Sequence, residues 1–125
     1  MNWVDTQMLQ AAIGTGDPVR DCWHFISIVQ REVFNIDLPD FSEDHANILP
    51  DFIVAQTQSQ WQQIDEDDIH EGDLCIVNKR KMTPHIGVIT PDGGILHYSR
   101  GQPKTEKLNS LQWRRREREF YRYRR

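Results

Sequence analysis

The apolar residues between positions 22 and 34 recur at helical spacing, and no other pattern constrains the fold as strongly. The residues on this common face, at i, i+3, i+4, i+7 and i+11, are Cys22, Phe25, Ile26, Val29 and Val33. Asp21 precedes the pattern as a natural N-cap, and Asn35 and Pro39 follow it as helix-ending residues. The sequence therefore predicts an amphipathic helix over 22–34 with Cys22 in its first turn.

The rest of the first half also favours helices, whereas the second half favours strands. We expect further helices over 3–13 and from about 51 to 62. The expected strands, which are short apolar or alternating runs, are 74–78, 85–90, 95–99, 104–108 and 118–124. Helices followed by a run of strands indicate an α+β fold with an antiparallel sheet.

Length and composition limit the alternatives. A chain of 125 residues fits one domain, which we expect to span 1–125. Its two cysteines, Cys22 and Cys75, form no CxxC pair, so we expect neither a disulfide scaffold nor a structural zinc site. No run of 18 apolar residues occurs, so we expect no membrane-spanning helix. The N-terminus has neither a basic start nor an apolar stretch, which predicts synthesis in the cytoplasm without a signal peptide.

Charge is distributed unevenly along the chain. Residues 1–73 hold 2 basic and 15 acidic residues, whereas residues 74–125 hold 13 basic and 4 acidic ones. The basic segment from Trp113 to Arg125 is compatible with nucleic-acid binding or with a final strand. We favour the strand, with Phe120 buried and Arg122 and Arg124 mostly exposed, and do not expect nucleic acid as a partner.

Cys22 is the candidate nucleophile. A cysteine at the start of a helix faces the positive end of the helix dipole, which favours the reactive thiolate. The alternative is an inert cysteine on the apolar helix face. Cys75 lies within an apolar strand, where a thiolate is costly, so we expect it to be unreactive.

His85 is the candidate base, and His97 is the candidate residue that orients its ring. Between them lies the turn sequence Pro91-Asp92-Gly93-Gly94. If Thr90 pairs with Gly94, the two histidines become diagonal neighbours on one face of the hairpin. If Thr90 pairs with Ile95 instead, they lie on opposite faces. Hence the catalytic arrangement requires a three-residue turn or a glycine bulge.

The remaining histidines are weaker candidates. His24 points away from Cys22 on the helix, and His45 and His70 lie in acidic loops that we expect to face solvent. Their spacing relative to the carboxylates of 65–73 matches no established metal-binding pattern. We therefore predict no metal site.

Four motifs in order resemble the NlpC-type cell-wall cysteine peptidases. They are Asp21-Cys22-Trp23, Gly72-Asp73-Leu74, His85-Ile86-Gly87-Val88-Ile89 and His97. The resemblance covers about residues 10–123 and implies a papain-like α+β fold, with helices packed on an antiparallel sheet. It also implies the catalytic residues Cys22, His85 and His97, a peptidoglycan stem peptide as substrate, and no cofactor.

Two further features refine the resemblance. The segment 34–40 and the basic segment after Trp113 are similar to the phage and prophage tail-assembly branch of the family. That branch implies other tail proteins as partners, and delivery to a virion tail or to the periplasm and cell wall.

The family usually carries a Pro-Tyr motif before its cysteine, and this chain lacks the Tyr. We expect Arg20 and Trp23 to take its place in the substrate pocket.

The resemblance leaves two classes of function open. The first is a cysteine endopeptidase of the cell wall, and the second is a non-catalytic structural tail module with the same fold. The missing Tyr favours the second, whereas the presence of Cys22, His85 and His97 favours the first.

Overall fold

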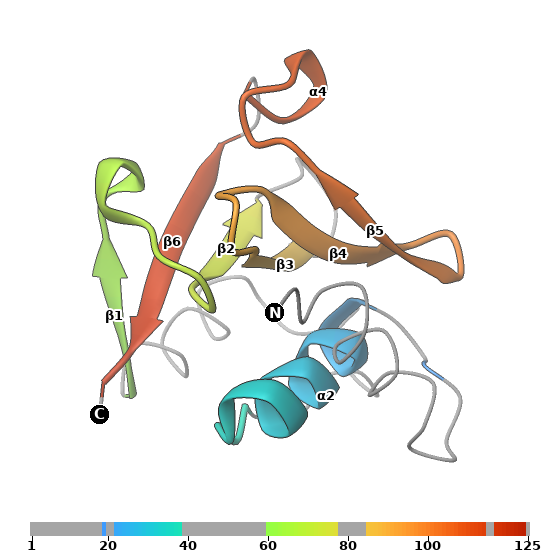
Figure 1. The fold of residues 1–125 in the computed structure, drawn as a ribbon, viewed down its shortest axis with the longest axis vertical. Coiled ribbons are helices and arrows are strands. Elements are labelled where there is room, and N and C mark those ends of the chain that lie inside the picture. The colour runs from blue at the N-terminus through green and yellow to red at the C-terminus, as the bar shows by residue number, and fades with distance from the viewer. Residues whose placement is uncertain (1–18, 20–21, 39–59, 78–84, 115–116, 125) are drawn as a thin grey trace.

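The computed structural model describes residues 19, 22–38, 60–77, 85–114 and 117–124. Its elements, in chain order, are α2 (Cys22–Phe34), β1 (Trp61–Ile64), the 3-10 helix η3 (Glu66–Asp68), β2 (Leu74–Val77), β3 (His85–Ile89), β4 (Ile95–Ser99), β5 (Gln102–Glu106), α4 (Leu111–Arg114) and β6 (Arg118–Tyr123). The strands form one antiparallel sheet in the order β1-β6-β2-β3-β4-β5 (Figure 1). The α+β fold predicted from the sequence is confirmed.

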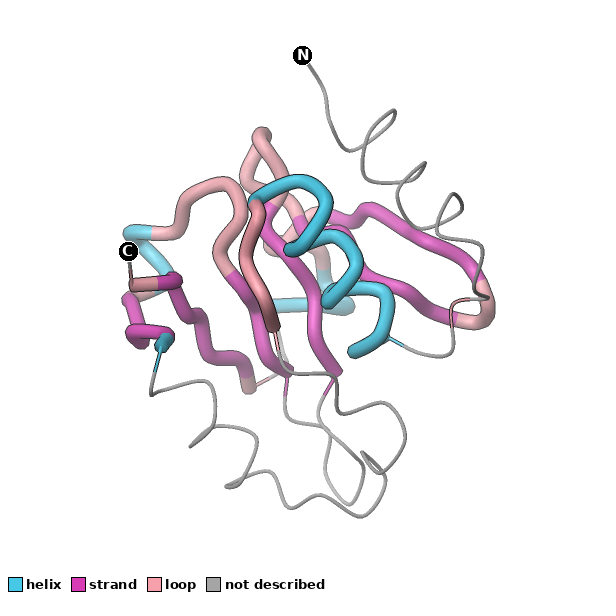
Figure 2. Tube along the Cα trace, turned by 90° about the horizontal axis from the view of Figure 1, so that it is seen from below, coloured by secondary structure: helices cyan, strands magenta, loops and turns pink. Residues whose placement is uncertain are grey.

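The helix α2 lies against one face of the sheet (Figure 2), where it contacts β3 and β4. Its apolar face packs on the side chains of the sheet that point toward it, among them Leu74, Ile76, Ile86 and Leu96. At its C-terminal end, Asn35 adopts a positive φ of 56°, and the Ile36 N–H donates to the Gln30 carbonyl. The helix therefore has the bounds that the apolar pattern predicts.

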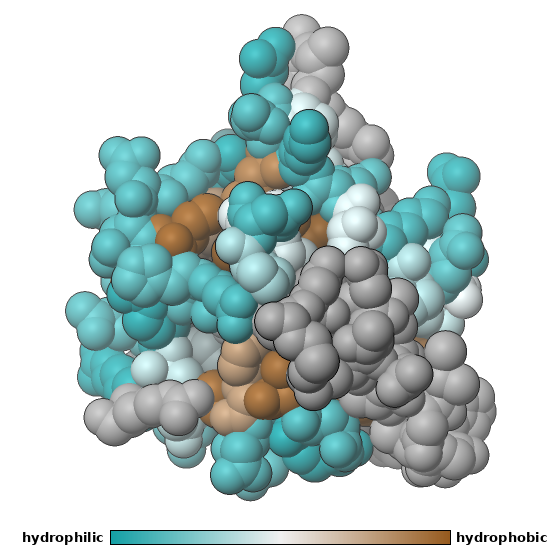
Figure 3. Space-filling model, in the orientation of Figure 1, coloured by the Kyte–Doolittle hydropathy of each residue, from teal (hydrophilic) through white to brown (hydrophobic). Residues whose placement is uncertain are grey.

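A second apolar cluster covers the opposite face of the sheet. Its members alternate along the strands with those of the first cluster and include Cys75, Val77, Ile89, Ile95, Leu108, Trp113 and Phe120. The short helix α4 contributes Trp113 to this layer. Hydrophilic residues cover most of the described surface in the view of Figure 3, with small apolar groups between them. The central strands β2 and β3 are thus buried on both faces, whereas the edge strands β1 and β5 are partly exposed.

Sequence and structure differ in two elements of the sheet. Trp61 and Gln62, expected in a helix, lie in β1, because pairing with β6 buries Trp61 against the Tyr123 ring. The strand expected over 104–108 begins two residues earlier, at Gln102. Arg100 and Gly101 both have positive φ, which makes the β4–β5 connection a tight two-residue turn. The predicted helix over 3–13 and the residues 51–59 lie outside the described residues.

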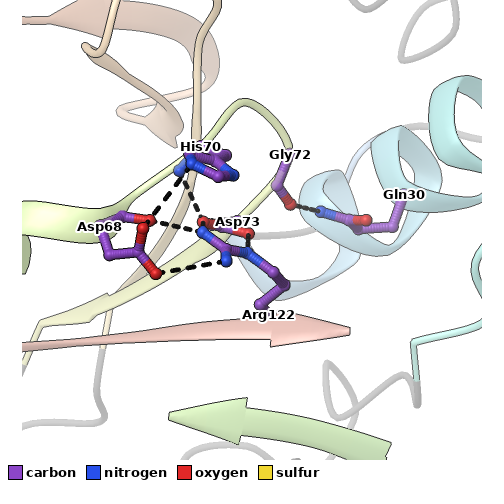
Figure 4. Close-up of polar contacts among 6 residues, drawn as sticks. All are labelled: Gln30, Asp68, His70, Gly72, Asp73 and Arg122. Atoms are coloured by element: carbon purple, nitrogen blue, oxygen red, sulfur yellow. Dashed lines mark hydrogen bonds and ion pairs between the residues drawn. The ribbon is translucent and has the colours of Figure 1, made fainter. Parts of the chain in front are cut away.

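The last strand, β6, is confirmed, and Phe120 is buried as predicted. Arg124 is exposed, but the prediction for Arg122 is wrong. Register pairs Leu74 with Tyr121, so Arg122 stays beside Asp73 and not beyond the sheet. Its guanidinium donates to both Asp73 carboxylate oxygens, at 3.0 and 2.9 Å (Figure 4).

This ion pair anchors the start of β2. The side chain of Asp73 is only 5% exposed, and its Oδ2 also accepts from the His70 backbone N–H at 2.7 Å. The hydrogen bond with Asp73 raises the pKa of Arg122 above its usual value. The neighbouring Gly72 has φ +92°, and an added Cβ would lie 2.9 Å from the Phe34 ring. The motif Gly72-Asp73-Leu74 therefore joins α2, β2 and β6.

No helix among the described residues has the length and hydrophobicity required to cross a bilayer.

We predict that Arg122→Met destabilises the protein by about 1–3 kcal/mol, because it leaves a buried carboxylate without its main donor. Urea denaturation monitored by tryptophan fluorescence measures the effect. The matched control is Arg124→Met, which removes an equal charge from an exposed position and should change stability by less than about 0.5 kcal/mol. Equal stability of the two variants would contradict the assigned role of Arg122.

Candidate active site

The β3–β4 hairpin has the register that brings the two histidines together. Gly87 pairs with His97, and the backbone N–H of Thr90 donates to the Gly94 carbonyl. The three residues between Thr90 and Gly94 form the turn, with Gly93 at φ +83°. His85 and His97 are therefore diagonal neighbours, as the first of the two predicted registers requires.

The two imidazole rings contact each other directly. His85 Nε2 lies 2.9 Å from His97 Nδ1, and the ring planes are nearly perpendicular. His97 is 5% exposed, whereas His85 is partly exposed at the first position of β3. Thus His97 is held inside the protein while the His85 ring stands at the end of the strand.

A carboxylate completes this chain of hydrogen bonds. His97 Nε2 lies 2.9 Å from Glu106 Oε2, and the Trp113 indole N–H donates to the same oxygen. Glu106 ends β5, and Trp113 lies on α4 with its ring 5.0 Å from that of His97. Sequence reasoning did not assign either residue to the site. The available signal was that Glu106 is the only acidic residue between positions 93 and 116.

Two contacts fix the direction of α2 relative to the histidines. Phe25 stacks on Tyr98 near the end of β4, with ring centroids 5.4 Å apart. Five residues later, Gln30 Nε2 donates to the Gly72 carbonyl, and the Gly72 N–H donates to Ile89 at the end of β3. The helix consequently runs alongside β3, and its first turn lies at the end of the sheet where β3 begins.

Cys22 is the first residue of this helix and is partly buried beside the core. Because β4 ends where β3 begins, the first turn of α2 and His85 lie at the same end of the sheet. The side chains of His85 and His97 share a face with Ile95, opposite the face that α2 covers. For the Cys22 thiol to reach His85, it must therefore extend past the end of β3.

The second cysteine lies in a different environment. Cys75 is fully buried, and burial raises the pKa of its thiol to about 12. A thiol with that pKa carries almost no thiolate at neutral pH. The expectation that Cys75 is unreactive agrees with this environment.

Of the other predicted candidates, the structure describes Trp23, His24 and His70. Trp23 is fully buried in the core, so it offers no surface to a substrate, contrary to its predicted role. Arg20 and His45 lie outside the described residues. His70 is exposed as expected and lies 3.8 Å from an Asp68 carboxylate oxygen. Within the described ranges, no three His, Cys, Asp or Glu side chains gather in a way that could hold a metal ion.

A cavity of about 790 Å³ borders η3, the β3–β4 turn and the segment after β5. Its lining includes Glu106 and Arg118 but none of Cys22, His85 and His97. In its wall, the Thr90 hydroxyl donates to Asp92 and lowers the pKa of that carboxyl. The cavity therefore reaches the hydrogen-bond chain at Glu106, whereas Cys22, His85 and His97 do not line it.

A comparison with known protein families identifies the family of this chain. The model of the NlpC/P60 family matches residues 11–122, which is most of the sequence. The protein belongs to the NlpC/P60 family. No curated protein sequence is significantly similar to it. NlpC/P60 proteins are generally cysteine peptidases, and membership suggests a role as a cell-wall peptidase acting on peptidoglycan.

We predict that iodoacetamide modifies Cys22 of the native protein much faster than Cys75. The reason is that Cys22 lies at a helix N-terminus and is partly exposed, whereas the thiol of Cys75 is buried. Peptide mass spectrometry over a time course measures both rates. After denaturation in urea the two rates should converge, and faster labelling of Cys75 in the native state would refute the assignment.

Proposed function

We propose that this NlpC/P60 protein is a cysteine endopeptidase that hydrolyses an amide bond in a peptidoglycan stem peptide. Cys22 is the nucleophile, His85 the general base and His97 the residue that orients His85. The observation that carries this proposal is the hydrogen-bond chain from His85 through His97 to Glu106, at the end of the sheet where α2 begins.

The reaction follows the usual sequence for a cysteine nucleophile. His85 takes the proton of the Cys22 thiol, and the thiolate attacks the amide carbonyl. The backbone N–H of Cys22, at the start of the helix, is suited to donate to the resulting oxyanion. His85 then returns the proton to the departing amine, which leaves a thioester on Cys22. Water hydrolyses that thioester and restores the thiol.

The substrate follows from family membership and from the motifs in the sequence. Cell-wall peptidases act on peptidoglycan, and we propose that the cleaved bond adjoins a D-amino acid such as D-Glu. The resemblance of segment 34–40 and of the sequence after Trp113 to tail-assembly members supports a location in a phage or prophage tail. From there the enzyme would reach the periplasm or cell wall together with other tail proteins.

The basic C-terminal segment is better explained by structure than by nucleic-acid binding. Arg118 is 10% exposed and forms a two-point ion pair with Glu66, with bonds of 2.8 and 2.6 Å. Arg122 is bound to Asp73. Two arginines of this segment therefore already have carboxylate partners within the domain.

We predict that His85→Ala abolishes hydrolysis of purified peptidoglycan and that His97→Ala reduces it less. A general base contributes about 10²–10⁴-fold, whereas an orienting residue acts only through the position and tautomer of the base. Release of soluble fragments, followed by chromatography and mass spectrometry, measures the rate and identifies the bond.

The control is His70→Ala, which removes an exposed histidine that is not part of the hydrogen-bond chain. It should retain wild-type turnover. Wild-type turnover by His85→Ala would overturn the assignment of the base. A wild-type protein that is inactive and alkylates at the rate of an ordinary free thiol would overturn the peptidase function.

A further inference from the structure

The carboxylate of Glu106 is bound on two sides by residues of the same layer. Oε2 accepts from the Trp113 indole and lies 2.9 Å from His97 Nε2. The His97 side chain is 6% exposed and that of Glu106 is 28% exposed. This position requires a hydrogen-bond acceptor such as a carboxylate, because an apolar residue there would leave a buried indole N–H and a buried ring nitrogen without their acceptor.

This arrangement determines where the protons of both rings lie. A carboxylate only accepts hydrogen bonds, so the proton of neutral His97 is on Nε2. His97 Nδ1 then carries a lone pair, and it must accept from the Nε2–H of His85. Consequently the lone pair of neutral His85 is on Nδ1, the nitrogen on the other side of its ring.

We propose that Glu106 is a positioning residue that sets the tautomers of His97 and His85 and stabilises the imidazolium that His85 becomes during turnover. The inference rests on the proposed function, since it assigns the His85 nitrogen that takes the proton of Cys22. Glu106 touches neither the thiol nor the substrate and acts only through His97.

The charge of Glu106 also matters once His85 is protonated. Imidazolium donates from both nitrogens, toward Cys22 through Nδ1 and toward His97 through Nε2. The Glu106 carboxylate polarises His97 as an acceptor and supplies the nearby negative charge. Of the nearby ionisable side chains, Lys104 pairs with His97 in the register and Arg114 of α4 is exposed. Within β3, β4 and β5, the strands that carry or flank the two rings, Glu106 is the only acidic residue.

The contacts around Trp113 hold the carboxylate in place. Arg118 Nη1 donates to the Leu108 carbonyl at 2.8 Å and to that of Trp113 at 3.3 Å, while its other nitrogens bind Glu66. The Trp113 side chain is 1% exposed. The indole is thereby fixed at both its backbone and its ring, and Glu106 has a rigid donor as its second partner.

The test is Glu106→Gln, which keeps the size of the side chain and removes its charge. We expect kcat for peptidoglycan hydrolysis to fall roughly tenfold, the difference between a hydrogen bond to a charged carboxylate and one to the neutral amide that replaces it. KM should not change, because Glu106 does not touch substrate. The rise of Cys22 alkylation with pH should begin about one pH unit higher than in the wild type, because a less stabilised imidazolium disfavours the thiolate beside it.

The matched control is Glu117→Gln, which changes the net charge equally at an exposed position. It should leave both kcat and the pH profile of Cys22 alkylation as in the wild type. A Glu106→Gln profile that superimposes on the wild-type one would overturn the role of Glu106 while leaving the peptidase intact. A wild-type Cys22 that alkylates with the pH profile of a free thiol would instead overturn the proposed function itself.

A measurement on the unaltered protein covers the case in which Glu106→Gln fails to fold. Nitrogen-15 NMR of labelled histidines reads the tautomer of each ring directly, with resonances assigned from His85→Ala and His97→Ala. We expect both neutral rings to carry the proton on Nε2. A His97 proton on Nδ1 would overturn the inference, whatever the behaviour of the variant.

Discussion

The β3–β4 turn carries the constraint on which the rest of the site depends. Thr90 and Gly94 pair through the backbone, and the Thr90 hydroxyl accepts from the Gly94 N–H at 2.9 Å while it donates to Asp92. A slip of one residue would move every side chain of β4 to the other face of the sheet. His97 would then lie among the residues beneath α2, and neither His85 nor Glu106 could reach it.

Ion pairs between the two halves of the chain account for the uneven charge distribution. Glu66 and Asp73 come from the acidic half, and their partners Arg118 and Arg122 come from the basic half. Both pairs join segments about fifty residues apart, and Arg118 also binds the carbonyls that position Trp113. The family motif around Asp73 thus has a structural role, far from the histidines.

Local patterns were sufficient for much of the fold and for part of the site. Helical periodicity gave both ends of α2, and alternation with strong turn residues gave β4 within its observed bounds. For the histidine pair the sequence left two hairpin registers open, and the structure has the one that brings His85 and His97 together. The strand β1 could not be read in this way, because Trp61 has no alternating neighbours and owes its conformation to pairing with β6. The predicted exposure of Arg122 was wrong because the register of β6 against β2, which places Arg122 beside Asp73, is a long-range property.

By itself, the sequence determined that an amphipathic helix begins at Cys22, that strands follow it, and that His85 and His97 can meet across a three-residue turn. Each of these depends on spacing within a short segment, because helix and strand geometry fix the direction in which each side chain of the segment points. Only the tertiary structure decided that Glu106 and Trp113 complete the histidine chain, and that α2 begins at the end of the sheet where His85 stands. Those relations join four separate elements, and no local pattern specifies how elements pack on one another.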